Sequence, residues 1–285
     1  MESHRSEFRL EKMCKVLEVS KSGFYKWLSA EPSAQEKHRE FLKKRITWHF
    51  FDNKKRYGSP RIADCLWKEG IHVSERTVAS LMREMGLKSC MSKKYRVSTT
   101  DSNHNLPIAP NLLNQNFAVS APNKVWVADI TYVPCREGKL YLASVLDLCT
   151  KQIVGWKLGS RMTEDLVLDA LKQAYKAKKP KKGLIHHSDR GSQYASKEYR
   201  NQLDTYKMQA SMSRKGNCYD NACIEAFHSS IKRELIYCTS FRTKAQAYDE
   251  IYEYIELFYN RKRVHSSLGY MSPVQFEARF YKKKA

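Results

Sequence analysis

The segment Val125-Trp126-Val127-Ala128-Asp129-Ile130-Thr131-Tyr132 gives the strongest indication of the fold of this chain. Its side chains are mostly apolar and rich in β-branched and aromatic types, which predicts a strand buried within a sheet. Asp129 is the exception, because a carboxylate avoids such a position unless it is paired or binds a cation. The stretch therefore predicts a core sheet that carries a functional charge.

Further strand and helix patterns follow this stretch. Three β-rich runs with short breaks predict an antiparallel meander: 124–134, 139–149 and 152–158. The next patterns predict a crossover helix, two strands and two more helices: 163–178, 183–188, 208–211, 197–206 and 221–236. Together they describe a mixed five-stranded sheet covered on both faces, which is the RNase H-like arrangement of an α/β protein.

The first third of the chain is helical and comes in two pieces, each resembling a helix-turn-helix. In residues 1–32, Ser20 is placed to cap a helix; in residues 33–96, Pro60 starts one helix and Ser74 caps the next. Such pairs can place a helix end in a major groove, although any small three-helix bundle has the same pattern. The basic side chains expected to contact DNA here are Lys21, Lys26, Arg61 and Arg76.

Residues 97–122 separate these helices from the core, which we place at 123–240. They are rich in Ser, Thr, Asn and Pro and contain one acidic and no basic side chain, which predicts a linker. A helical extension, 241–285, follows the core. Its basic loop, Arg261-Lys262-Arg263, is a further expected DNA contact.

The composition favours a polyanionic partner. The chain has 51 Lys plus Arg against 30 Asp plus Glu, a net charge of +21 that attracts nucleic acid by releasing its counterions. A basic surface that only maintains solubility is the alternative. The eight cysteines form no CxxC pair, so no zinc site is indicated. Without a signal-peptide pattern or an apolar run of about 18 residues, a cytoplasmic protein is expected.

Two more acidic residues join Asp129 in a candidate active site. Asp189 ends a short strand where the chain turns, and Glu225 lies beside the apolar stripe of the helix at 221–236. Each alone has an ordinary structural explanation, but three gathered carboxylates repel one another unless a hard divalent ion such as Mg²⁺ binds. Two such ions can activate the attacking oxygen and stabilise the leaving one in a phosphoryl displacement.

Polar side chains surround these three carboxylates in the sequence. Asn221, His228 and Lys232 share one helix face with Glu225, because they lie four before and three and seven after it. Arg190 directly follows Asp189. We expect these four side chains to contact DNA.

The order of these residues resembles the DDE transposase and retroviral integrase superfamily. Asp189 and Glu225 are separated by 35 residues, the spacing for which its signature is named. Several motifs narrow the resemblance to the OrfB transposases of the IS-three family of insertion sequences: Trp126 to Tyr132, His187 to Tyr194, Tyr57-Gly58-Ser59-Pro60-Arg61-Ile62, Asn111-Leu112-Leu113 and Tyr259-Asn260-Arg261. With Ser20 to Trp27 and His265 to Tyr270, these motifs cover nearly the whole chain.

The resemblance implies DNA strand cleavage and strand transfer at the ends of an insertion sequence. Asp129, Asp189 and Glu225 would bind two Mg²⁺ ions, which Mn²⁺ can replace, and Lys232 would lie beside DNA. It also implies terminal-repeat and target DNA as substrates, a homo-oligomer on DNA, a nucleoid location, and pairing or fusion with an upstream OrfA product. Two alternatives stay open: an inactive DNA-binding regulator, and a structure-specific nuclease of the same fold.

Overall fold

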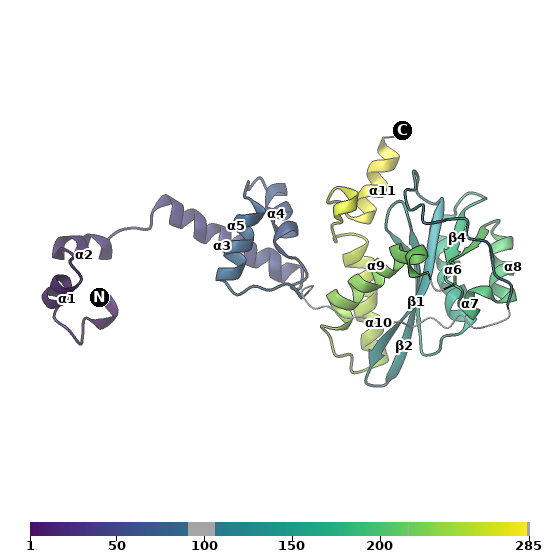
Figure 1. Ribbon diagram of the computed structural model, residues 1–285, viewed down its shortest axis with the longest axis horizontal. Helices are drawn as coiled ribbons and strands as arrows, with labels where there is room; N and C mark the ends of the chain where they lie inside the picture. Colours follow the sequence, from purple (N-terminus) through teal and green to yellow (C-terminus); the bar gives the residue numbers. More distant parts are fainter. Residues whose placement is uncertain (91–105, 216, 284–285) are drawn as a thin grey trace.

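The computed structural model describes residues 1–90, 106–215 and 217–283 (Figure 1). Among the described residues, five N-terminal α-helices precede the sheet: α1 (Leu10–Val16), α2 (Lys21–Leu28), α3 (Ala34–Asp52), α4 (Ser59–Lys68) and α5 (Glu75–Glu84). Short 3-10 segments lie near the two ends of the chain, at η1 (Glu2–His4) and η6 (Ser266–Leu268). Figure 1 shows α1 and α2 at one end of an elongated molecule, α3 to α5 in the middle, and the sheet at the other end.

The caps predicted for the N-terminal helices are confirmed. The Ser20 hydroxyl accepts the Gly23 N–H at 2.9 Å, and the Ser74 hydroxyl accepts the Thr77 N–H at 3.1 Å. The nineteen-residue helix α3 was not predicted. Its large apolar side chains are split between buried and exposed positions, with Trp48 51% exposed, so its sequence shows no clear helical stripe.

The sheet has the mixed five-stranded order β3-β2-β1-β4-β5, which confirms the RNase H-like fold class. The first three strands pair antiparallel: β1 (Val125–Cys135), β2 (Gly138–Asp147) and β3 (Ile153–Gly159). After the crossover helix α6 (Glu164–Lys178), β4 (Ile185–Ser188) pairs parallel with β1, and β5 (Gln209–Met212) pairs parallel with β4.

Alternation along β1 sends its side chains into two cores. Val125 and Val127 join the core beneath α9 (Ala222–Ile231) and α10 (Lys244–Tyr252), whereas Trp126 and Ala128 join the core on the other face. That other face is covered by α6, α7 (Ser192–Ala195) and α8 (Lys197–Thr205). Asp129 has the parity of Val127, so it lies on the α9 face.

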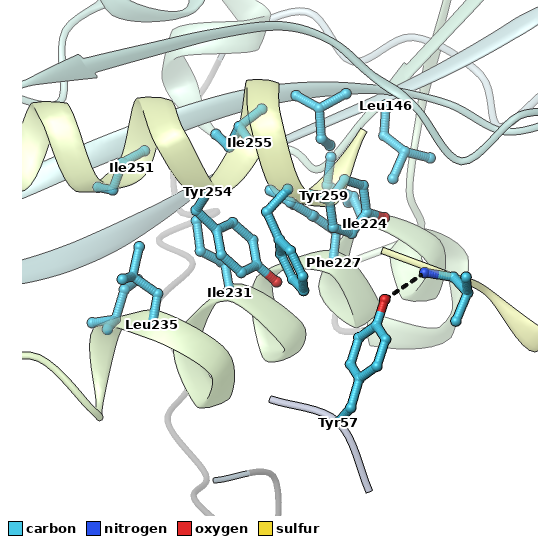
Figure 2. Close-up of a cluster of buried hydrophobic side chains, with 14 of the residues drawn as sticks. Tyr57, Leu146, Ile224, Phe227, Ile231, Leu235, Ile251, Tyr254, Ile255 and Tyr259 are labelled. Carbon is cyan, nitrogen blue, oxygen red and sulfur yellow. Dashed lines mark hydrogen bonds between the residues drawn. The ribbon is translucent and has the colours of Figure 1, made fainter. Parts of the chain in front are cut away.

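The helix at 221–236 was predicted as one element, but the structure divides it. It begins as the 3-10 turn η3 (Cys218–Asn221), continues as α9 and ends in the π-helical segment η4 (Lys232–Ile236). Helix α10 likewise continues into a π-helical segment, η5 (Glu253–Tyr259). Figure 2 shows apolar side chains of both helices packed together. The last helix is α11 (Pro273–Lys282).

Part of the predicted linker lies against the core. The Leu112 N–H donates to the Ser211 hydroxyl at 2.9 Å, and the side chain of Leu113 is only 4% exposed. Residues 106–122 therefore pack as a strap along the core, while 97–105 lie outside the described residues. Within the described ranges, none of the helices is both long and apolar enough to span a membrane.

Candidate active site

The parallel pair β1 and β4 brings the first two carboxylates together. Its last paired residues are Ala128 and Ser188; Asp129 comes next along β1, and Asp189 directly follows the end of β4. Neighbouring parallel strands lie about 4.8 Å apart, so the two aspartates emerge side by side where the strands part. The sequence predicted that Asp189 lies at a strand end, and the register of β1 with β4 shows that Asp129 is its neighbour.

Asp129 contacts the helix that covers its face of the sheet. Its Oδ2 lies 3.3 Å from Nδ1 of His228 on α9, and its Oδ1 accepts the N–H of Ile130 at 2.8 Å. The side-chain amide of Asn221 donates to the Ala128 carbonyl at 3.3 Å. These contacts hold α9 against the strand at the carboxylate.

Asp189 stands at a tight turn that leads into α7. Its Oδ1 accepts the N–H of Gly191 at 2.9 Å. A β-carbon at Gly191 would lie 3.1 Å from that oxygen, so glycine leaves the carboxylate room. Tyr194 follows in α7 and is buried; burial raises its pKa well above the ordinary value, and Tyr199, Asp129 and Asp189 add to the shift. The negative charges of both aspartates therefore reach the buried Tyr194 hydroxyl.

Glu225 lies on α9 one turn before His228 and is exposed to solvent. Neighbouring protein atoms reduce the hydration of its carboxylate and so raise its pKa, and the negative charge of Asp129 raises it further. The two carboxylates are thus close enough to repel each other, which is the electrostatic condition that favours a bound cation.

The donor chemistry of this site fits a hard divalent ion. All three side chains are carboxylates, and the neighbouring Nε2 of His228 and Oδ1 of Asn221 are buried without a hydrogen-bond partner in the described part of the chain. In this conformation, no three His, Cys, Asp or Glu side chains within residues 1–90, 106–215 and 217–283 already form a metal-binding group. The backbone contacts of Asp129 and Asp189 hold each carboxylate in place separately.

Lys232 follows Glu225 by two helical turns and stands where the π-helical segment begins. Its Nζ lies 4.8 Å from the centre of the Tyr132 ring on β1. Burial lowers the pKa of Lys232, and Asp129 partly opposes that shift. The ammonium group is therefore held over the Tyr132 ring and within the field of Asp129.

Replacing Lys232 with Met should lower the salt dependence of DNA binding by about one unit of slope and slow strand joining. Methionine keeps an unbranched stem over Tyr132 but removes the charge. Binding titrations over a range of salt concentrations measure the slope, with Lys176→Met, at an exposed lysine of α6, as the matched control. An unchanged slope and joining rate would leave Lys232 with a packing role only.

The structure buries three of the expected DNA contacts: Asn221, His228 and Arg263 are at most 5% exposed. These three face the protein interior because each finds a polar partner there. Arg61 is partly buried and lies 3.4 Å from the buried carboxylate of Glu234. Arg190 is half-buried, and its Nε donates to the Ser213 carbonyl at 2.7 Å. The expected contacts that stand on the surface are Lys21, Lys26, Arg76, Arg261 and Lys262, of which Lys21 pairs with Glu11.

Sequence reasoning missed the organising role of Asp220. Its buried carboxylate accepts hydrogen bonds from Arg214 at 2.8 Å, from Gln115 at 2.8 Å and from Asn111 at 3.0 Å. The hydrogen bonds from Arg214 lower its pKa, because they stabilise the ionised form. Asp220 thereby ties the strap at 106–122 to the start of α9. Its position one residue before the polar face of that helix was the available signal.

Comparison with known families covers most of the chain. Residues 119–218 and 206–273 match the family described as Integrase core domain, and residues 37–95 match the HTH-like domain. The chain is 46% identical over 273 residues to the insertion element IS600 uncharacterized 31 kDa protein of Shigella sonnei, covering 96% of this chain and 100% of that protein. It is 40% identical over 279 residues to transposase InsF for insertion sequence IS3A of Escherichia coli, covering 97% and 96%.

Solved structures give more distant similarities. The HTLV-2 integrase catalytic core domain in complex with magnesium is 17% identical, with a TM-score of 0.43 over 55% of this chain and 98% of that one. The BIV integrase catalytic core domain is 16% identical, with a TM-score of 0.42 over 57% and 98%.

Proposed function

The chain belongs to the integrase-core transposases of insertion sequences, and on this premise we propose that Asp129, Asp189 and Glu225 form its active site. It is a DNA transposase and so a polynucleotidyl transferase. The reaction we assign is metal-dependent cleavage and strand transfer at the ends of the element. The observation that supports it most is the parallel register that sets Asp129 beside Asp189, with Glu225 in the field of Asp129.

Three carboxylates would hold the metal: Asp129, Asp189 and Glu225. When bound, two Mg²⁺ ions supply activation of the attacking oxygen and stabilisation of the leaving one. His228 orients Asp129 through the contact at 3.3 Å, and Asn221 fixes α9 to β1. Tyr194 is buried in the core on the other face of the sheet, close enough to both aspartates for their charges to raise its pKa. Lys232 binds a phosphate next to the scissile bond.

The assay that tests this function offers two DNA substrates to the same protein. Duplexes ending in the element's terminal repeats should be cleaved and joined to a second DNA, whereas unrelated ends should react far less. Cleavage without joining would support the structure-specific nuclease instead. Binding without either reaction would support the DNA-binding regulator.

We propose that DNA ends are bound in a homo-oligomer, because the active site must meet two DNA segments for strand transfer. The net charge of +21 supports double-stranded DNA as the partner. We further propose that the protein acts in the bacterial cytoplasm at the nucleoid. There it would work with, or as a fusion to, an upstream OrfA product that adds recognition of the ends.

Removing residues 1–32 should reduce the preference for terminal-repeat DNA over random DNA by about tenfold or more. Helices α1 and α2 carry exposed Lys21 and Lys26 and lie far from the sheet in Figure 1, so the remaining protein should fold. Competition binding with specific and random duplexes measures the preference. A truncation near Ala121 is a poorer test, because it also removes Tyr57 and Leu113 from the core. Equal preference with and without residues 1–32 would move recognition elsewhere.

A further inference from the structure

A buried carboxylate outside the proposed active site, that of Glu234, forms the centre of a polar network. Its side chain has no solvent exposure and accepts hydrogen bonds from Arg263 at 2.8 and 3.0 Å and from the Tyr254 hydroxyl at 2.7 Å. Arg61 lies 3.4 Å away. Burial is the largest single influence on the pKa of Glu234 and raises it, but the charges of Arg263 and Arg61 and the hydrogen bonds from Arg263 and Tyr254 together outweigh it, so the net shift is downward. An unpaired charge at this depth is strongly destabilising, so the network must stay complete.

The second helical unit, α3 to α5, reaches this network through the segment before α4. Tyr57 is 2% exposed; its hydroxyl donates to the Lys262 carbonyl and accepts the Val264 N–H, both at 3.2 Å. Figure 2 shows Tyr57 pointing into the core and its bond to that N–H. The Arg56 guanidinium lies 4.4 Å from the centre of the Phe258 ring. This segment is therefore seated in the core, where it is not available to DNA.

Glu234 lies on the same continuous helix as Glu225. It belongs to η4, in which the Tyr237 N–H donates to the Lys232 carbonyl five residues back, at 2.8 Å. Such a π-turn disturbs the regular helical pairing of nearby carbonyls. Nε of Arg56 donates to the Glu234 carbonyl at 3.2 Å. The second helical unit thus contacts both the backbone and the side chain of Glu234.

We propose that Arg56, Tyr57 and Arg61 position the active-site helix. When α3 to α5 are seated on the core, their contacts with Glu234 and the 262–264 segment fix the rotation and axial position of α9 and η4. Glu225 and Lys232 move with that helix. These contacts, which we call the joint, therefore couple a DNA-binding unit to the reaction. This inference rests on the function proposed for Glu225, and it makes Arg61 a positioning residue.

The test uses the full-length double variant Tyr57→Phe with Arg61→Met, which keeps the ring and the aliphatic bulk but removes the polar contacts. Single-turnover strand transfer should slow by about 10- to 100-fold, because a small displacement of reacting groups is costly. Terminal-repeat binding should stay within about threefold and keep its salt slope. The matched control is Arg136→Met, at an exposed arginine in the turn between β1 and β2, which should leave both unchanged.

A cysteine pair at the same joint allows a measurement, independent of activity, of whether α3 to α5 are packed on the core. Burial raises the pKa of the Cys90 thiol and the neighbouring Cys238 thiol adds to that shift, so the two lie close together. The Cys90 N–H donates to the Lys55 carbonyl at 3.1 Å, and the Cys238 thiol donates to the Arg233 carbonyl at 3.2 Å. Diamide takes two protons and two electrons from the thiols and leaves a disulfide that peptide mass spectrometry can map. Its formation should be severalfold slower in the double variant than in the wild type and the Arg136 variant.

Each outcome separates the inference from the proposed function. Slower crosslinking with slower transfer, partly restored by Arg61→Lys, supports positioning. Slower crosslinking with strand transfer at the wild-type rate overturns it. Normal crosslinking together with a salt dependence of DNA binding lowered by about one unit of slope also overturns it, because Arg61 would then be a DNA contact. Should the double variant fail to fold, Tyr57→Phe alone gives the same readouts. An inactive wild-type protein would refute the proposed function, while crosslinking would still report seating.

Discussion

Replacing Asp129 with Asn, Asp189 with Asn or Glu225 with Gln is expected to lower DNA cleavage and joining by several orders of magnitude. Each change keeps the shape of the side chain and removes the charge that would hold a metal ion. Binding of terminal-repeat DNA should be nearly unchanged, because the basic surfaces remain. Strand-transfer assays under single-turnover conditions, beside binding titrations, measure the two effects separately.

The same variants should fold at least as stably as the wild type without metal. For Glu225→Gln the sign follows from the raised pKa of Glu225, whose ionised form is disfavoured in the folded protein. The wild type is therefore penalised as the pH rises above about 4.3, the usual value for glutamate, and the variant is not. Its advantage in unfolding free energy should grow from acidic to neutral pH, as denaturant titrations would show.

Asp204→Asn, at an exposed aspartate of α8, is the control for loss of a negative charge alone. It should leave cleavage, joining and DNA binding at wild-type levels. Strand transfer near the wild-type rate in any one active-site variant would remove that residue from the site. For Asp129 or Asp189, it would overturn the two-metal mechanism.

The sequence was most informative where local pattern and chemistry agree. A charged residue in the apolar run around Asp129 indicated both a buried strand and a functional group, and the strand and helix patterns predicted the mixed sheet. The adjacency of Asp129 and Asp189 depends on which strands pair and in what register. That pairing is a long-range property, which the predicted topology suggested but local patterns could not fix.

The basic side chains show where sequence reasoning failed. Arg263 stands in a run of three basic residues and resembles a surface loop, yet it is 4% exposed because Glu234 neutralises it inside the protein. The partners are 29 residues apart, and no local pattern links them. Arg61 is misleading for the same reason, since its helix has helix-turn-helix character while its side chain points to Glu234.

The elements that join domains were also hidden from the sequence. Residues 106–122 have the composition of a linker, but Leu112 and Leu113 fasten them to the core. The π-helical turns at 232–236 and 253–259 leave the apolar spacing close to that of an ordinary helix. Their consequence, a joint between α3 to α5 and the active-site helix, depends on tertiary contacts alone.

Removing divalent metal should abolish cleavage and joining, a loss of several orders of magnitude, while terminal-repeat DNA stays bound. Asp129 and Glu225 repel each other without a cation. The backbone contacts of Asp129 and Asp189 do not depend on metal, so a chelator should leave the carboxylates in place but the site inactive. Added Mg²⁺ or Mn²⁺ should restore the reaction. Ca²⁺ should support binding but little chemistry, because its longer and looser coordination positions the reacting oxygens poorly. Joining assays across a metal series measure this order, and full activity in chelator would refute metal-dependent catalysis.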